Sequence, residues 1–160
     1  MDWMNETTEQ MPKGAFLMVD GNPMTIGWCQ YGVLWGKRTC TIYVRKSRYT
    51  HQLLENAATF TVSVPALGTM RKELAYCGVH SGRDGNKLQA IHAALSPARF
   101  GAQDGFLGCK AHIECRILYR QDLSLDGFDD DAIQQSYYGA GDEHTVYVGE
   151  ILGVYEEPAV

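Results

Sequence analysis

The strongest constraint on the fold is the alternation of apolar and polar residues along three stretches of the chain. Residues 41–44 read TIYV, residues 59–64 read TFTVSV, and residues 111–120 read AHIECRILYR. A period of two places successive side chains on opposite faces of an extended strand. Further apolar runs over residues 15–20, 24–28 and 146–155 predict more strands, so that five or six strands are expected in all.

Helical patterns lie between these strands but do not follow each one. Apolar residues spaced by three or four predict short helices over residues 70–76 and 87–94, with another near residues 132–138. A doubly wound parallel sheet would need strict alternation of strands and helices. The pattern therefore predicts a mainly β fold with inserted helices, as a mostly antiparallel barrel. We expect a single domain over residues 14–160, after a loose segment over residues 1–13.

Charge is spread unevenly along the chain. All 14 Lys and Arg residues lie in the first 120 positions, which hold 9 acids and a net charge of +5, whereas residues 121–160 hold 10 acids and no Lys or Arg. Five cations crowd into residues 37–48. A patch this compact suits a small anion, and the acidic remainder argues against a nucleic-acid partner.

Three features of the sequence indicate the cellular compartment of the protein. No apolar run approaches the ~20 residues of a membrane-spanning helix. The first ten residues are polar and acidic, unlike a secretion signal. Five cysteines, an odd number, indicate free thiols in a reducing compartment. We therefore expect a cytoplasmic protein with no membrane partner.

The strand over residues 41–44 runs directly into a cluster of cations. Arg45, Lys46 and Arg48 follow it, and Thr50 occupies the expected N-cap position of a helix. A helix N-terminus with an arginine fork and a hydroxyl group beside it would hold a phosphate through charge-assisted hydrogen bonds. The alternative is a solvated turn with scattered cations.

Two other features concern ligand binding and metal binding. The glycine-rich segment over residues 77–87, CGVHSGRDGNK, is either a surface connection or a loop that faces a ligand. Two Cys-x2-His pairs occur, but Cys109 and His112 are an odd number of positions apart and would point to opposite faces of a strand. We therefore expect no metal site. Dinucleotide-binding, P-loop and serine-hydrolase motifs are absent from the sequence.

Six blocks of sequence occur together in a recognisable order. They are NPMTIGW from Asn22, GVLWGK from Gly32, YVRKSRYT from Tyr43, CGVHSGRD from Cys77 followed by Lys87, CRILYRQDL from Cys115, and HTVYVGEI from His144. Together they resemble the flavin reductase-like family, and flavoredoxin is its most similar branch. The resemblance extends from about Gly14 to Tyr155.

The resemblance implies a fold and a set of site residues. The family's fold is an FMN-binding split β-barrel, usually found as a homodimer. By resemblance, the isoalloxazine ring would be lined by Asn22, Met24, Thr25 and Trp28. The phosphate and ribityl chain would be held by Arg45, Arg48, Tyr49 and Thr50. The loop that closes over the flavin would contribute Ser81, Gly82, Arg83 and Lys87, and His144 would lie on the substrate side.

The resemblance also implies a redox function. Bound FMN would transfer a hydride or electrons between NAD(P)H or an electron-carrier protein and an acceptor, so no catalytic residue is assigned. One alternative is a non-catalytic flavin-binding module that serves as a store or sensor. Another is a barrel that holds a different ligand, such as heme, or none. The sequence leaves the choice between FMN and FAD open, along with the electron donor and acceptor.

Overall fold

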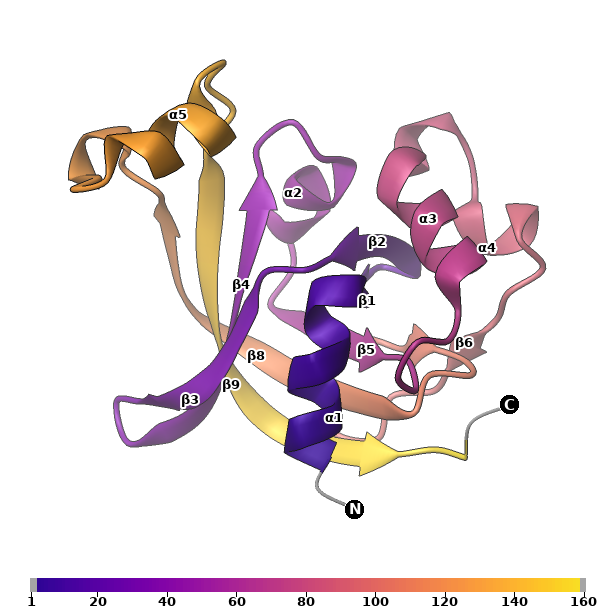
Figure 1. Cartoon of the computed structure of the whole chain (residues 1–160). Coiled ribbons are helices and arrows are strands. Elements are labelled where there is room, and N and C mark those ends of the chain that lie inside the picture. The colour runs from indigo at the N-terminus through magenta and orange to yellow at the C-terminus, as the bar shows by residue number, and fades with distance from the viewer. Residues whose placement is uncertain (1–2, 159–160) are drawn as a thin grey trace.

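The computed structural model describes residues 3–158, and its centre is a seven-stranded antiparallel sheet (Figure 1). The strands are β1 (Ala15–Val19), β2 (Asn22–Ile26), β3 (Cys29–Leu34), β4 (Lys37–Arg45), β5 (Thr59–Val64), β8 (Ala111–Asp122) and β9 (His144–Glu156). They are ordered β2-β1-β5-β8-β9-β4-β3. A separate pair is formed by β6 (Leu95–Ser96) and β7 (Gly105–Phe106). The predicted mainly β, mostly antiparallel fold is confirmed.

The two edges of the sheet are consecutive in the chain. Only Gly27 and Trp28 separate β2 from β3, although these strands lie at opposite ends of the strand order. The sheet must therefore curl until its edges approach each other, which makes it a split barrel. Strands β1, β2, β4, β5, β8 and β9 all contribute buried side chains to the core that this curl encloses, including Leu17, Ile42 and Phe60.

Strand β3 shows what the alternation pattern missed. Residues 29–34 pair with β4 as a hairpin, and its turn residues Trp35 and Gly36 have φ of 55° and 70°. Two positive φ values in succession are typical of a tight hairpin turn, so the glycine at the second position has a conformational reason. Val33 and Leu34 point to opposite faces of this hairpin and both are exposed, so no alternation of apolar and polar residues marks the strand in the sequence.

Helices cover the barrel at several points. They are α1 (Trp3–Gln10), α2 (Tyr49–Leu54), α3 (Arg71–Val79), α4 (Lys87–Ala90) and α5 (Asp131–Tyr138), with short 3-10 turns η1 (Met11–Lys13), η2 (Gly82–Asp84) and η3 (Leu125–Gly127). Beneath α3 a second core forms, in which Phe16 and Phe106 stack with ring centroids 4.0 Å apart. Among the described residues, no helix is long and apolar enough to cross a membrane.

The expectation of a loose segment over residues 1–13 is corrected for residues 3–13, where the structure places α1 and η1; residues 1 and 2 lie outside the described residues. The reason is a set of long-range contacts that local sequence does not reveal. The buried amide of Gln10 donates to the Gly14 carbonyl and accepts from the Gly68 N–H, and Lys110 lies 2.6 Å from Glu6. Thr7 and Met11 are also buried.

Candidate functional site

Three adjoining cavities form a groove at one end of the barrel. Figure 1 shows α2, α3 and α5, which contribute to their linings, at that end of the molecule. We call these cavities the cationic cavity (about 170 Å³), the central cavity (about 250 Å³) and the apolar hollow (about 480 Å³). Met24 and Arg48 line both of the first two, while Gly27, Trp28 and Tyr43 line both of the last two. The three cavities therefore form one continuous site.

The cationic cavity lies where β4 turns into α2, as the sequence predicted. Its lining includes Ser47, Arg48, Tyr49, Thr50, Ser81, Arg83 and Lys87. Arg48 is held by two bonds, from Nε to Met24 Sδ at 3.3 Å and from Nη2 to the Gly78 carbonyl at 3.0 Å. Within the described residues its Nη1 has no hydrogen-bond partner. A fixed guanidinium with a free N–H is suited to an anion.

Thr50 lies at the predicted place but not in the predicted role. Helix α2 begins at Tyr49 with Arg48 as its N-cap residue, so Thr50 is already inside the helix. Its hydroxyl accepts a hydrogen bond from Asn22 Nδ2 at 3.1 Å and does not cap the backbone. The N-cap expectation is therefore wrong, because a partner from β2 takes the side chain.

The glycine-rich loop over residues 77–87 closes against the cationic cavity, and a surface connection is the poorer description of it. A Cβ on Gly82 would lie 2.2 Å from Asn22 Oδ1 and 2.5 Å from the Tyr49 ring, so only glycine allows this approach. Arg83 donates to the Ser47 carbonyl at 3.2 Å and lies over the Tyr49 ring.

Lys87 is buried beneath the same loop. Its ammonium donates to the Pro23 carbonyl at 2.7 Å and to the Cys77 carbonyl at 3.2 Å. Burial lowers the pKa of Lys87, and the neighbouring charge of Arg48 lowers it further. The amine thus ties β2 to the end of α3, and its third hydrogen remains for the cavity that it lines.

The central cavity, which Arg48 also lines, combines apolar walls with two cations and one imidazole. Met24, Thr25, Trp28, Arg45 and His144 all line it. Thr25 donates from its hydroxyl to the Leu74 carbonyl at 2.6 Å, so its methyl group is the part left for a ligand. The cavity is therefore a space of mixed polar and apolar lining next to a cationic one.

Arg45 and Arg48 both line the central cavity, but only Arg48 also lines the cationic cavity. Its guanidinium donates to the carbonyls of Asp142 and Tyr137, at 2.9 and 3.0 Å, and lies 5.2 Å from the centre of the Tyr138 ring. Arg45 therefore anchors the α5 segment to β4 and borders the central cavity. It lies outside the cationic cavity.

His144 lies between the central cavity and the wall of the apolar hollow. Its Nδ1 is 2.7 Å from the Tyr138 hydroxyl, and its ring centroid is 4.7 Å from that of Trp28. Burial lowers the pKa of His144 to about 4, and the charge of Arg45 contributes while Asp142 opposes it. The imidazole is therefore neutral near pH 7.

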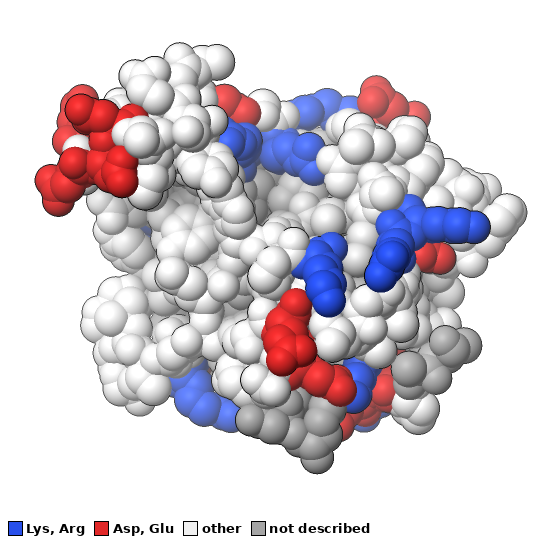
Figure 2. All heavy atoms as spheres, viewed as in Figure 1, with Lys and Arg blue, Asp and Glu red and all other residues white. Residues whose placement is uncertain are grey.

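The apolar hollow is walled mainly by aromatic and aliphatic side chains. Its lining includes Trp28, Tyr43, Leu123, Phe128, Ile133, Tyr137 and Tyr138. The segment that carries the last five of these also carries exposed acids, and Figure 2 shows acidic side chains gathered at the corner that α5 occupies in Figure 1. The hollow is thus apolar inside and bordered by negative charge.

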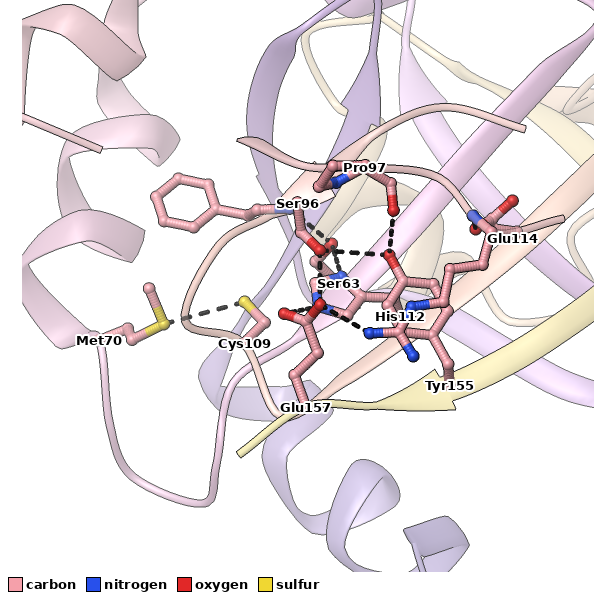
Figure 3. A network of polar contacts seen from close by, with 11 residues as sticks. Ser63, Met70, Ser96, Pro97, Cys109, His112, Glu114, Tyr155 and Glu157 are labelled. Carbon is pink, nitrogen blue, oxygen red and sulfur yellow. Dashed lines mark hydrogen bonds and ion pairs between the residues drawn. The ribbon is translucent and has the colours of Figure 1, made fainter. Parts of the chain in front are cut away.

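A second polar cluster, on β5 and β8, contains the residue types of a catalytic triad, but it is closed to solvent and substrate (Figure 3). Ser63 Oγ is 2.8 Å from His112 Nδ1, and His112 Nε2 is 3.4 Å from Glu157 Oε2. Ser63 and His112 have no exposed surface. A Cβ on Gly105 would lie 2.3 Å from His112 Nδ1, so no space remains for a substrate. This cluster is structural.

Comparison with known proteins decides the family. The family model described as "Flavin reductase like domain" matches residues 5–160. The chain belongs to this family.

Solved structures share the fold of this flavin reductase-like chain. Flavoredoxin from Methanosarcina acetivorans is 24% identical, with a TM-score of 0.66 over 91% of this chain and 68% of its own. The FMN-binding protein from Thermus thermophilus, with bound p-hydroxybenzaldehyde, is 23% identical, with a TM-score of 0.66 over 91% and 71%. The NADH:FAD oxidoreductase from Streptomyces globisporus C-1027, in complex with NAD and FAD fragments, is 23% identical, with a TM-score of 0.67 over 91% and 75%.

The structure brings most of the predicted site residues to one groove and adds others. Eleven line the cationic or central cavity: Met24, Thr25, Trp28, Arg45, Arg48, Tyr49, Thr50, Ser81, Arg83, Lys87 and His144. Asn22 and Gly82 lie behind them as contacts of Thr50 and Tyr49. Sequence reasoning missed Phe128, Tyr137 and Tyr138. Their aromatic character among the acids of residues 121–145 was the available signal.

Proposed function

We propose that the groove of this flavin reductase-like protein binds FMN. The phosphate would occupy the cationic cavity, held by Arg48, Thr50, Ser81 and Arg83. The isoalloxazine ring would lie in the central cavity against Met24, Thr25 and Trp28. The observation that carries the proposal is that these two cavities share Met24 and Arg48, so an anion and a planar ring joined by a short chain fit together.

Solved structures that share the fold include a flavoredoxin and a protein described as FMN-binding, but also an NADH:FAD oxidoreductase, so the fold fits either flavin. We favour FMN because Arg83 and Ser47, both in the lining of the cationic cavity, are joined by a hydrogen bond there, which suits a terminal phosphate. The remaining predicted residues would act indirectly: Asn22 would position Thr50, Gly82 would let the loop approach, and Arg45 would hold the α5 segment.

We propose that the protein is an oxidoreductase of the flavin reductase or flavoredoxin type. Bound FMN would supply transfer of a hydride or of single electrons. The chain would bind and orient the ring, and the Lys87 ammonium would favour negative charge nearby. Electrons would come from NAD(P)H or an electron-carrier protein. The apolar hollow beside the ring cavity supports turnover over a flavin store, because a store needs no second binding space.

The first experiment is a visible spectrum of the purified protein, with identification of any released flavin. Flavin absorbance that bleaches with NADH without oxygen is the expected result for a reductase, whereas bleaching only by dithionite or a reduced carrier indicates electron transfer. Protein that neither contains nor binds FMN would refute the proposal.

A variant sharpens the test of the phosphate site. Replacing Arg48 and Thr50 with Ala should weaken FMN binding by about 2–3 kcal/mol, because charge-assisted bonds to the phosphate are lost. Arg38→Ala, which removes an exposed cation elsewhere on β4, is the control and should bind FMN normally. Full flavin occupancy of the double variant would show that the phosphate lies elsewhere.

We also propose a cytoplasmic homodimer. The β3–β4 hairpin exposes 75% of Val33 and 58% of Trp35, and apolar surface of this kind is typical of protein interfaces. All five cysteines are free, which supports a reducing compartment. Light scattering of the wild type and of Val33→Asp tests the assembly: the wild type should be a dimer and the variant a monomer.

A further inference from the structure

The apolar hollow has the size and walls of a small-molecule site. Its volume of about 480 Å³ is within the ordinary range of ligand pockets. Aromatic rings form much of its surface, and Trp28 and Tyr137 pack edge to face with centroids 5.1 Å apart. Such walls favour a planar aromatic ligand, which can stack on or pack against them.

The polar groups around the hollow are few and uncharged. Tyr43 donates from its hydroxyl to Gln30 Oε1 at 2.8 Å, so the Gln30 amide nitrogen remains available as a donor. At the boundary with the central cavity, Tyr138 occupies His144 Nδ1, and within the described residues His144 Nε2 has no hydrogen-bond partner. Donors of this kind suit a carbonyl oxygen on the ligand.

Charge restricts the ligand further. The lining of the hollow contains no Lys, Arg, Asp or Glu, and the nearby Arg45 is already bound to two carbonyls. The segment that forms one wall exposes four acids, Asp126, Asp129, Asp130 and Asp131. An anion in the hollow would be repelled by these acids and would find no cation in the described lining to pair with, since Arg45 keeps its charge but lines the adjoining central cavity.

We propose that the apolar hollow binds the electron acceptor, and that this acceptor is a planar aromatic molecule, uncharged or cationic, of which a quinone is the simplest example. The hollow's role as the acceptor site rests on the proposed function. A quinone bound here would take a hydride from reduced flavin and a second proton from solvent, and would leave as the hydroquinone.

The test measures binding first, so that it does not depend on turnover. Naphthoquinone and the anionic naphthoquinone sulfonate are titrated against the protein as purified, with quenching of tryptophan fluorescence as the readout. Naphthoquinone should bind at least about tenfold more tightly than the sulfonate. Tyr137→Ala should weaken naphthoquinone binding about three- to tenfold. The control is Tyr119→Ala, since Tyr119 is similarly exposed (44% against 49%) but lies outside the hollow.

A charge variant tests the effect of the acidic border on ligand binding, independently of the aromatic walls. Asp129→Asn combined with Asp131→Asn should improve binding of the sulfonate about threefold at low salt and leave naphthoquinone unchanged. The Asp130 cap of α5 is left in place, because its side chain accepts from two backbone N–H groups. Glu9→Gln combined with Glu156→Gln changes the net charge equally, away from the hollow, and should have no effect.

Reoxidation kinetics then test the role as acceptor. Dithionite-reduced protein is mixed with each quinone in the absence of oxygen. Naphthoquinone should reoxidise the protein faster than the sulfonate does, when each rate is divided by the rate for free reduced FMN. Equal binding of both quinones, or wild-type binding by Tyr137→Ala, would overturn the proposed ligand class. Quinone binding of the expected pattern in a protein that takes up no flavin would overturn the proposed function and the acceptor role, but would uphold the ligand class.

Discussion

His144 and His112 lie on neighbouring strands and have similar local chemistry, yet they belong to different kinds of region. Each is buried, each has a pKa lowered chiefly by burial, and each contacts a tyrosine, Tyr138 in one case and Tyr155 in the other. His144 lines a cavity of about 250 Å³. His112 is enclosed by Ser63, Glu157 and the backbone of Gly105.

The difference shows that residue type alone does not make a site. The cluster of Ser63, His112 and Glu157, which we call the closed cluster, has a serine, a histidine and an acid in contact, as in the catalytic triad of a serine hydrolase. Its polar groups instead bond to other groups of the protein, since Ser63 Oγ also accepts from the Phe106 N–H at 3.0 Å. The groove has fewer such contacts and leaves donors unpaired. Space next to an unpaired donor, more than the donor's identity, distinguishes the two regions.

The largest effect should come from placing a methyl group in the closed cluster. Gly105→Ala would put a Cβ 2.3 Å from His112 Nδ1 and 3.0 Å from Ser63 Oγ, and we expect a loss of about 3 kcal/mol in the free energy of unfolding. Urea denaturation measures it. Gly32→Ala is the control, because its Cβ would meet no atom within 4 Å. Equal stability of the two variants would mean that the cluster is loosely packed.

The next effect concerns the buried carboxylate of the same region. Glu114 accepts hydrogen bonds from the backbone N–H groups of Arg99, Phe100 and Ala102, at 2.5, 2.8 and 3.0 Å. Glu114→Gln sets an amide NH2 against at least one of these donors and should cost about 2–3 kcal/mol in unfolding free energy. Glu150→Gln is the control and should cost clearly less, because Glu150 is partly exposed and its partners Lys37 and Arg116 lie at the surface. Flavin content should stay normal, and a loss of bound flavin would contradict the separation of the two regions.

A pH titration addresses the groove histidine. The pKa of His144 is about 4 in the folded protein and 6.5 ordinarily, so the unfolded chain takes up the proton first. The stabilisation is complete above pH 6.5 and falls as the pH drops toward 4, by about 2 kcal/mol between pH 7 and pH 5. The unfolding free energies of the wild type and His144→Gln, measured across this range, isolate the contribution. Parallel pH curves would show that His144 is more solvated than its burial indicates.

The smallest effect distinguishes the two tyrosines. The Tyr138 hydroxyl makes a 2.7 Å bond to His144, whereas the Tyr155 hydroxyl has only longer contacts, at 3.3 and 3.4 Å. Tyr138→Phe should cost about 1 kcal/mol in unfolding free energy, and Tyr155→Phe less than about half of that. Chemical denaturation of both variants is sufficient, and the reverse order would show that the closed cluster depends on Tyr155 more than its geometry indicates.

Local periodicity predicted much of the fold correctly. The strand over residues 59–64 begins and ends as expected, because apolar and β-branched residues alternate there without a break. It did not predict the burial of the polar face of β5 and β8. Thr61, Ser63, His112 and Glu114 have no exposed surface, because the segment that follows α4 folds over them. Such coverage depends on contacts between residues far apart in the sequence.

The sequence by itself located the cationic cavity, since a strand, a run of cations and a following helix are neighbours along the chain. It also determined the antiparallel character of the sheet through its alternation. Only the tertiary structure decided that Arg45 turns to the α5 segment while Arg48 faces the loop of Gly82, and that Tyr137 and Tyr138 wall a hollow. The physical reason is that cavities and hydrogen-bond partners arise where distant segments pack, and no local pattern specifies that packing.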